Sequence, residues 1–412
     1  MIHNLVRKTT TLRPSALLML LVLVLITMVQ YFVAAEENDK YKLPELCPAL
    51  KSELFGYIIE EHQTPEDYII SKFKDHDIVF IGEFHRIKQN VELIHRLIPK
   101  LYENSVHILG IECALYENQG KIDSLIFADS YDEFSAQRIL FNQFVFWGYQ
   151  EYADLFKTAW SLNNALPEDS IPFRVIGLNI KPDWRYVMTM EDRDNPEVMK
   201  KVWSLGDPDE YMAQTIIKEI IEKNEKALIF CGSHHAFTEY KQPLYDEKTK
   251  EFTGFDENRM GNLIYDIIGK RAFTIMLHAP WINAQGYSSP YVYPVDGIID
   301  ALLATLPAFY RNAAFDTKET PFGSLPARTT LYKYGYKHFS LNNYCDGYIC
   351  QGLLSEYTGV TPIQGFINEN NLEAAKLQSP NPEFKKASTT IEDFNRAIQQ
   401  DANISYRFRK YK

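Results

Sequence analysis

The sequence of 412 residues contains little cysteine and a single long apolar run. Five cysteines cannot all pair within one chain, because their number is odd. Cys345 and Cys350 are close enough in sequence to form a disulfide in an oxidising compartment, whereas Cys113 follows and Cys231 ends a predicted buried strand, so both are expected to be core residues. The cysteine spacing, Cys47 included, fits no zinc knuckle or ribbon, which excludes that class of small zinc domain.

The one long apolar run lies near the N-terminus. Basic residues precede the stretch ALLMLLVLVLITMV, and Val33 and Ala35 supply small residues before Glu36. This arrangement predicts a signal peptide over residues 1–35, cleaved before Glu36. The run is also long enough to span a bilayer, so a membrane anchor at residues 15–35 is the alternative. Either way, the sequence predicts an exported protein that is secreted, periplasmic or lumenal.

Positive charge is in deficit, with 43 lysines and arginines against 54 acidic residues and a net charge of -11. This balance excludes nucleic acid and an anionic membrane surface as the main partner. Apolar residues make up 46% of the chain, as in a globular protein with a sizeable core, and aromatic residues make up 14%. We therefore expect a small-molecule or peptide substrate, and membrane contact only through an uncleaved leader.

Strand and helix patterns alternate along most of the chain. Apolar runs predict strands at 78–82, 106–111, 173–180, 226–231 and 271–277. Amphipathic patterns predict helical segments at 89–104, 119–165, 211–225 and 257–269. Such alternation predicts an α/β fold, with a mostly parallel sheet flanked by helices on both faces.

The remaining segments complete this domain. We assign residues 36–75 to a helical segment before the first strand and residues 76–378 to a single α/β domain with an irregular C-terminal elaboration. Residues 379–412 form a polar C-terminal tail, in which IEDFNRAIQQ is expected to be helical.

Acidic and histidine side chains stand where the predicted strands end. In chain order they are Glu83, His85, Glu112, His234, His235 and His278. Because the C-terminal ends of parallel strands meet at one edge of the sheet, where ligands bind, we expect several of these groups to converge. Carboxylates and imidazoles at that edge predict a metal site or an acid–base site.

Each of these residues also has a structural interpretation. Glu83 and His85 are two residues apart, so both side chains point to one face of an extended segment. The alternative is that His85 caps the next helix while Glu83 pairs with Arg86. Glu112 must be solvated, paired or ligating, because burying a lone carboxylate costs several kcal/mol. His278, beside a proline, is equally well explained as a loop histidine.

Other catalytic motifs are missing. The sequence has no Gly-x-Ser-x-Gly elbow, no Walker loop, no dinucleotide fingerprint and no His-Glu-x-x-His segment. A serine hydrolase is therefore disfavoured. Hydrolysis would use a water activated by a metal or by a base.

Two segments resemble a known superfamily. They are IGEFHRIKQNVELIHRLIPKLYENSVHILGIE and KALIFCGSHHAF. They resemble motifs of the group that joins the erythromycin esterases, the haem-uptake-associated ChaN lipoproteins and the Tiki/TraB proteases, and the similarity spans about residues 65 to 280. On that alignment His235 is the matching histidine, and His234 occupies a position that is usually small.

The resemblance implies a helix-flanked sheet in which Glu83, His85, Glu112 and His235 converge. In the esterase branch such residues support attack of water on an ester, with a histidine as general base. The Tiki branch is associated with a divalent metal and peptide cleavage, and the ChaN branch with haem iron. The Glu-x-His spacing is closer to the ChaN and Tiki branches than to the macrolide esterases, which disfavours a macrolide substrate.

Our leading hypothesis is an exported hydrolase that cleaves an ester or amide bond with activated water. Glu83 and Glu112 would bind a metal or orient water, His85 would be a ligand or partner, and His235 would be the base or a ligand. This ligand set suits Zn²⁺ or Mn²⁺, and a metal-free acid–base site is the other form of the hypothesis.

Two further interpretations stand beside the hydrolase. His234 and His278 are additional candidate metal ligands. The main alternative function is a protein of the ChaN type that binds haem, iron or another ligand without turnover. The third is a catalytically inactive scaffold with an aromatic groove for a partner.

Overall fold

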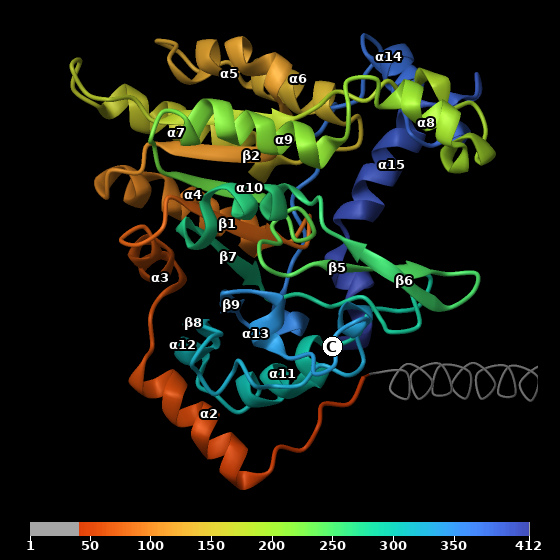
Figure 1. The fold of residues 1–412 in the computed structure, drawn as a ribbon. Coiled ribbons are helices and arrows are strands. Elements are labelled where there is room, and N and C mark those ends of the chain that lie inside the picture. The colour runs from red at the N-terminus through yellow and green to blue at the C-terminus, as the bar shows by residue number, and fades with distance from the viewer. Residues whose placement is uncertain (1–40, 412) are drawn as a thin grey trace, which may run out of the picture.

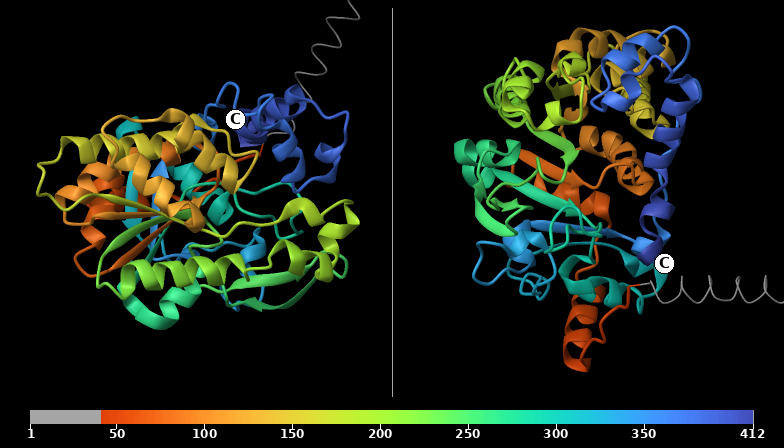
Figure 2. Two further views of the ribbon diagram at one scale, coloured as in Figure 1. Left: turned by 90° about the horizontal axis from the view of Figure 1, so that it is seen from above. Right: turned by 90° about the vertical axis from the view of Figure 1, so that its right-hand side faces the viewer.

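A seven-stranded sheet with helices on both faces forms the centre of the molecule (Figures 1 and 2). The structure, a computed structural model, describes residues 41–411. Across the sheet the strands are β3 (Arg174–Asn179), β2 (Ile108–Leu115), β4 (Ala227–Gly232), β1 (Ile78–Glu83), β7 (Ala272–Leu277), β9 (Gly347–Gln351) and β8 (Asn312–Asp316). All neighbouring pairs are parallel except β8 with β9, which is antiparallel at one edge. The predicted α/β class with a mostly parallel sheet is therefore confirmed.

The central strand β1 is buried on both faces, as its continuous apolar sequence requires. Alternate residues of a strand point to opposite faces. Val79 and Ile81 belong to one hydrophobic cluster, and Ile78 and Phe80 belong to another. The sheet thus separates two cores.

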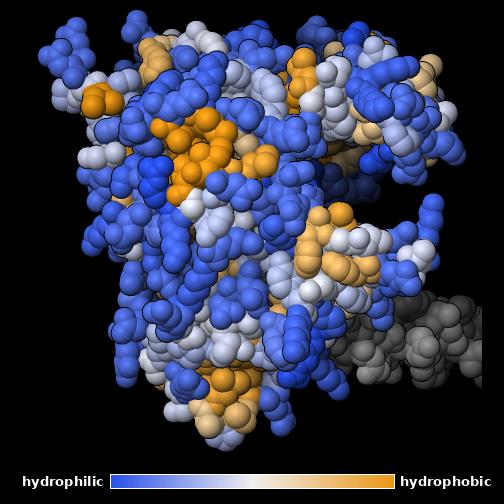
Figure 3. Space-filling model, in the orientation of Figure 1, coloured by the Kyte–Doolittle hydropathy of each residue, from blue (hydrophilic) through white to orange (hydrophobic). Residues whose placement is uncertain are grey.

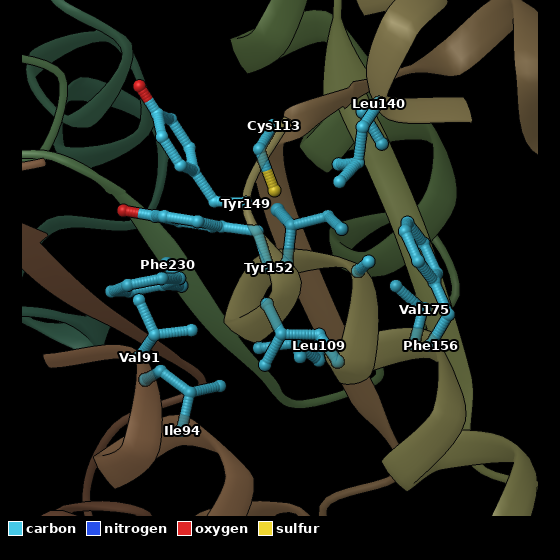
Figure 4. Close-up of a cluster of buried hydrophobic side chains, with 14 of the residues drawn as sticks. Val91, Ile94, Leu109, Cys113, Leu140, Tyr149, Tyr152, Phe156, Val175 and Phe230 are labelled. Atoms are coloured by element: carbon cyan, nitrogen blue, oxygen red, sulfur yellow. The ribbon is translucent and has the colours of Figure 1, made fainter. Parts of the chain in front are cut away.

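Helices from different parts of the chain contribute to each core. The first core receives α3 (Pro65–Lys72), α4 (Lys88–Glu103), α5 (Gln119–Ile126), α6 (Glu133–Gln143), α7 (Gln150–Ala165) and α15 (Ile391–Ala402). The second core receives α2 (Pro48–Glu60), α9 (Pro208–Ile216), α10 (Met260–Ile268) and α11 (Ile298–Leu303). Part of the first core is drawn in Figure 4, where Leu109 and Val175 of the sheet meet Phe156 of α7.

The predicted helical region 119–165 is divided into α5, α6 and α7. Asp132 begins α6, because its side chain accepts a hydrogen bond from the backbone N–H of Phe134. Gly148 lies between α6 and α7, where a Cβ atom would come within 2.5 Å of the Phe366 ring. Two tight turns therefore interrupt a stretch whose apolar pattern alone indicated one long helix.

The structure contains strands that the sequence patterns did not indicate. The antiparallel hairpin of β5 (Gln242–Asp246) and β6 (Glu251–Asp256) extends to one side of the domain in Figure 1. In Figure 3 hydrophobic residues gather over this hairpin, and Leu244 and Phe252 are exposed there. The edge strand β8 was also unexpected.

The C-terminal residues cover the domain. As predicted, IEDFNRAIQQ is helical, and it forms most of α15. Thr390 and Asp393 form a capping box at its start. Phe394 and Ile398 of α15 are buried in the first core. After the short helix α16 (Ile404–Arg407), Phe408 packs in a third cluster with Ile87 and Tyr411.

All five cysteines are free. Cys345 and Cys350, which we considered as a disulfide pair, are both buried thiols, with Cys345 at the end of α13 (Leu341–Tyr344) and Cys350 within β9. Cys113 and Cys231 are buried strand residues, as expected.

The predicted signal peptide and the alternative anchor at residues 15–35 lie outside the described residues. Among residues 41–411, no helix combines the length and the apolar character needed to cross a bilayer.

Candidate functional site

The C-terminal ends of β2, β4 and β1 lie side by side and carry the predicted site residues. Glu83, the last residue of β1, is opposite Gly232, the last residue of β4. Glu112 follows Ile111, which is opposite Phe230 of β4. The parallel register therefore brings Glu83, Glu112 and the residues after Gly232 to one edge.

Gly232 has no room for a side chain at this edge. A Cβ atom there would lie 2.8 Å from His85 Nε2 and 3.4 Å from Glu112 Oε2. The backbone N–H of Gly232 donates a hydrogen bond of 2.6 Å to Glu112 Oε2. The glycine thus lets two strand-end side chains approach the β4 backbone.

Glu83 and His85 form a hydrogen-bonded pair. His85 Nδ1 lies 2.9 Å from Glu83 Oε1, which also accepts a 2.7 Å hydrogen bond from the Tyr152 hydroxyl. The Glu83 side chain is only 2% exposed, and its Oε2 atom has no hydrogen-bond partner among the described residues. In Figure 4 the hydroxyl group of Tyr152 points away from the aliphatic side chains around Leu109. Because a carboxylate only accepts hydrogen bonds, Nδ1 of His85 carries a proton, and Nε2 makes no hydrogen bond with residues 41–411.

His235 is bound in a similar way by a residue that the sequence analysis did not select. Its Nδ1 atom lies 2.6 Å from Oδ1 of Asp209, which is buried in the first turn of α9. Asp209 also accepts hydrogen bonds from the backbone N–H of Met260 at 2.8 Å and from Arg259 Nη1 at 3.1 Å. The carboxylate therefore accepts three hydrogen bonds, and it fixes the orientation of the imidazole.

Glu112 lies between the two histidines. His235 Nε2 is 3.5 Å from Glu112 Oε1, and His85 Nε2 is 3.9 Å from Glu112 Oε2. Burial raises the pKa of Glu112, but the neighbouring His235 and His85 and the Gly232 N–H outweigh it and hold the pKa below its usual value. Glu112 is therefore an anion that faces both imidazoles.

The pKa of His235 is raised to about 9. Burial alone would lower it, but the negative charges of Glu112 and Asp209 on the two sides of the ring have the larger effect. Asp209 in turn has a lowered pKa: burial opposes its charged form, and the hydrogen bond from His235 overcomes that cost. At neutral pH His235 is thus an imidazolium between two carboxylates.

These contacts form a continuous series of side chains along the sheet edge, which we call the ionic row. Its members are Tyr152, Glu83, His85, Glu112, His235 and Asp209. Four of them, Glu83, His85, Glu112 and His235, are the residues that the sequence analysis placed in the site. The structure brings these four together.

The two other candidate histidines lie outside the row. His234 Nε2 lies 2.9 Å from the Tyr332 hydroxyl, and the ring stacks on Phe237. Burial lowers the pKa of His234 to about 3, so it is neutral. His278 is fully buried, with its ring nitrogens near the Tyr348 hydroxyl at 3.0 Å and Asp300 Oδ1 at 3.2 Å.

The predicted metal ligands are not arranged as a metal site. Within residues 41–411, no group of three or more His, Cys, Asp or Glu side chains has the arrangement needed to hold a metal ion. The side chains of the ionic row are instead paired with one another. We therefore derive the chemistry of the site from their own protons and charges.

A cavity of about 270 Å³ opens beside the row. Its polar wall includes Glu83, His85, His234 and His235. Its aromatic wall includes Phe84, Trp281, Tyr291, Tyr332 and Tyr344. The cavity thus offers an apolar surface for an organic ligand next to acid–base groups.

Three residues that shape the site gave no distinguishing signal in the sequence. Asp209 is an acidic residue in a first helical turn, which is common on helix-dipole grounds alone. Tyr152 is one of many aromatic residues around α7, and Arg259 directly precedes α10. Only the approach of α7, α9 and α10 to the strand ends reveals their role.

Comparison with known proteins is informative only at the level of structure. The chain matches no protein-family model and no curated protein. Among solved structures, it is similar to a protein from Bacillus cereus, with 13% identity and a TM-score of 0.46 over 74% of this chain and 97% of the other. It is also similar to a succinoglycan biosynthesis protein, with 12% identity and a TM-score of 0.49 over the same shares of the two chains.

A third similar structure is ChaN of Campylobacter jejuni with cofacially bound haem. The identity is 14% and the TM-score 0.35, over 56% of this chain and 92% of ChaN. A ChaN protein, from the superfamily that the two sequence segments resemble, is thus among the solved structures to which this chain is similar.

Proposed function

We propose that this protein is a hydrolase that cleaves an ester or amide bond with water activated by the ionic row. The observation that supports the proposal is the pairing of each histidine with its own carboxylate, Glu83 for His85 and Asp209 for His235, beside an organic-ligand cavity. Each pairing uses Nδ1 and turns Nε2 toward the space around Glu112. His235 carries the positive charge described above, and Nε2 of His85 makes no hydrogen bond within residues 41–411, so we assign the two histidines different roles.

His85 is the general base in this proposal. Its Nδ1 proton is held by Glu83, so Nε2 is free to take a proton from water. Glu83 then stabilises the imidazolium that forms, and Tyr152 holds Glu83 in place. The edge of the His85 ring faces Trp147, with ring centroids 4.9 Å apart, which further restricts its orientation.

His235 supplies positive charge. Because its pKa is about 9, it is protonated at neutral pH, so in this proposal it takes neither of the roles, base or ligand, that the sequence suggested. It instead offers an N–H and a positive charge to an oxygen atom that becomes negative during the reaction. Asp209 fixes the ring for this purpose.

The reaction follows from these two roles. A water molecule loses a proton to His85 Nε2 while its oxygen forms a bond to the carbonyl carbon. The carbonyl oxygen becomes an oxyanion, which His235 stabilises. The intermediate collapses as the bond to the leaving group breaks, and His85 returns its proton to the leaving alcohol or amine. The products are a carboxylic acid and that alcohol or amine.

A panel of nitrophenyl esters and short peptides tests the proposal. We expect turnover by the purified protein and a loss of about 100-fold or more in kcat/KM for His85→Gln. His62→Gln is the matched control, because His62 lies beyond α2 with its Nε2 atom near the Asn312 carbonyl oxygen. If the wild type and His85→Gln hydrolyse every active substrate equally fast, the proposal is wrong.

Metal content is measured on the same samples. We expect no stoichiometric Zn²⁺ or Mn²⁺, and activity that survives chelation. About one metal ion per chain, lost together with activity in Glu83→Gln, would replace the metal-free mechanism with a metal-assisted one.

Haem binding is the second candidate function. The observation in its favour is the aromatic cavity wall next to His85 Nε2, which has no hydrogen-bond partner within the described chain. The imidazole is a possible axial ligand for haem iron. A Soret band on haem titration that disappears in His85→Gln would support this function, and an unchanged haem spectrum would refute it.

A further inference from the structure

Two arginines line the same cavity as the ionic row. Arg86 follows His85 directly after β1, and Arg407 is the last residue of α16. The two are far apart in the sequence, and the packing of the C-terminal segment brings them to one wall. Neither arginine has a part in the hydrolytic steps described above.

Arg86 is held rigidly at this wall. Its backbone is in the left-handed region, with φ 72°, and its carbonyl oxygen accepts a hydrogen bond from the N–H of Val360. Its guanidinium stands over the rings of Trp147, at 5.0 Å, and Tyr149, at 5.6 Å. Nε donates to the Tyr149 hydroxyl at 3.0 Å. The side chain is only 14% exposed, so the charge is fixed in position.

Arg86 is also connected to the ionic row. Its backbone N–H donates to the Tyr152 hydroxyl at 3.1 Å, and that hydroxyl donates to Glu83. These hydrogen bonds fix the position of Arg86 relative to His85. A ligand group that contacts Arg86 is therefore held in a fixed position relative to the His85 imidazole.

Arg407 has a charge that no side chain neutralises directly. Its guanidinium lies 5.1 Å from the ring centroid of Phe84, and it makes no hydrogen bond or ion pair with any residue between 41 and 411. Burial lowers the pKa of Arg407, and the positive charge of Arg86 lowers it further. Both arginines line the same cavity, so their positive charges repel one another there.

Acidic groups near these arginines do not balance their charge. Asp401 is 3.4 Å from Arg86 Nη2, but its side chain is 49% exposed and does not belong to the cavity lining. Glu83 is the one acidic residue among the described residues that line the cavity, and His85 and Tyr152 already bind it. Arg86 and Arg407 therefore give the cavity lining an excess of positive charge in a protein whose net charge is -11.

We propose that Arg86 and Arg407 form a subsite for an oxyanion, a carboxylate or a phosphate group, carried by the ligand of this cavity. Guanidinium groups bind such anions through paired N–H donors, and repulsion between two arginines is relieved when an anion lies between them. Trp281 and Tyr291 line the same cavity and offer an apolar surface to the rest of the ligand. Resting on the proposed function, this assigns the substrate to anionic esters or amides.

Direct binding tests the subsite without any turnover. Calorimetric titrations of the purified protein compare benzoate, inorganic phosphate and the neutral analogue benzamide. We expect at least one of the two anions to bind, benzamide not to bind measurably, and anion affinity to fall as salt is added. Benzoate binding alone assigns a carboxylate, and phosphate binding alone assigns a phosphate.

Substitutions of single arginines test whether the anion binds at Arg407. Arg407→Gln is expected to weaken anion binding by about tenfold or more. Arg409→Gln removes the same charge two residues further along, where the side chain is exposed and contacts Tyr406. It is expected to leave the affinity unchanged. Arg407→Lys, which keeps the charge but loses the paired donors, is expected to give an intermediate affinity.

The results separate this proposal from the proposed function. His85→Gln is expected to lose hydrolysis and to keep anion binding. If neither anion binds, or if Arg407→Gln and Arg409→Gln bind anions equally, the subsite is refuted whatever the activity. If anions bind as predicted but no ester or amide is cleaved, the subsite stands and the hydrolase is refuted.

Discussion

Replacing Asp209 with asparagine is expected to lower the pKa of His235. The pKa of His235 is about 9, against an ordinary value of 6.5. This difference corresponds to about 3 kcal/mol at about 1.4 kcal/mol per pKa unit. Glu112, 3.5 Å from Nε2, and Asp209, 2.6 Å from Nδ1, share this stabilisation. Without the Asp209 charge, the pKa of His235 should fall by about 1 to 3 units.

The same substitution changes how stability depends on pH. Because the folded-state pKa of His235 lies above the unfolded value, its contribution to the free energy of unfolding is fully present below about pH 6.5. That contribution is lost as the pH rises through about 9. In Asp209→Asn the alkaline loss should shrink by about 1.4 kcal/mol for each unit by which the pKa falls.

Two measurements check these values. Nuclear magnetic resonance follows the imidazole signals with pH, and the His235 signal is identified by its absence in His235→Gln. Urea unfolding at several pH values gives the free energy of unfolding, and the difference between variant and wild type cancels groups that titrate equally in both. Glu210→Gln is the control, because Glu210 is the exposed next residue of α9. A pKa of His235 that remains at about 9 in Asp209→Asn would refute the assignment of its charge to Asp209.

Three further substitutions have defined outcomes. Tyr152→Phe removes the buried hydrogen bond to Glu83, so urea unfolding should show a loss of about 1 to 3 kcal/mol, and an unchanged stability would contradict the role of Tyr152. Gly232→Ala places a methyl group 2.8 Å from His85 Nε2, so the imidazole must move and kcat/KM should fall by about 100-fold. The circular dichroism spectrum should remain native. Full activity would show that the site tolerates the displacement of His85. Phe394→Ala should lower the free energy of unfolding by about 3 to 5 kcal/mol, because the Phe394 ring is fully buried between α15 and the first core. A loss below about 1 kcal/mol in urea unfolding would mean that α15 contributes little to the stability of this core.

The site residues at or just after the strand ends could be predicted because local patterns determine them. Glu83, Glu112 and His235 each follow an apolar run, and a parallel sheet necessarily brings the ends of such runs to one edge. Asp209 could not be found in this way. It comes from a helix N-terminus, where an acidic residue is expected for reasons unrelated to function. Its contact with His235 depends on how α9 packs, which no local pattern specifies.

The charge of His235 could not be predicted from the sequence either. A histidine at a strand end is equally suited to act as a base, an acid or a ligand. Only the two carboxylates on opposite sides of the ring determine its charge, and Asp209 is separated from it by 25 residues of intervening chain.

The unpredicted strands have physical explanations. β8 has the sequence NAAFD, whose small residues have low strand propensity, and it pairs only with β9 at the sheet edge. The hairpin β5–β6 is rich in charged residues and lies outside the main sheet. β8 is stabilised by pairing with the distant strand β9, and the hairpin by its own pairing and by packing such as that of Phe255 on Tyr336, rather than by an apolar run.

The third cluster holds the C-terminal segment, which supplies Arg407 to the cavity, against the rest of the domain. Phe408 packs on Phe84 at the strand exit, and the backbone N–H of Tyr41 donates to the carbonyl oxygen of Lys410. This small cluster is separate from the two large cores, and local opening of such units occurs at lower free energy than global unfolding. Each opening would withdraw Arg407 from the cavity. A bound ligand should therefore slow amide hydrogen exchange throughout residues 404–411, so that the protection of a surface segment reports on occupancy at the centre of the molecule.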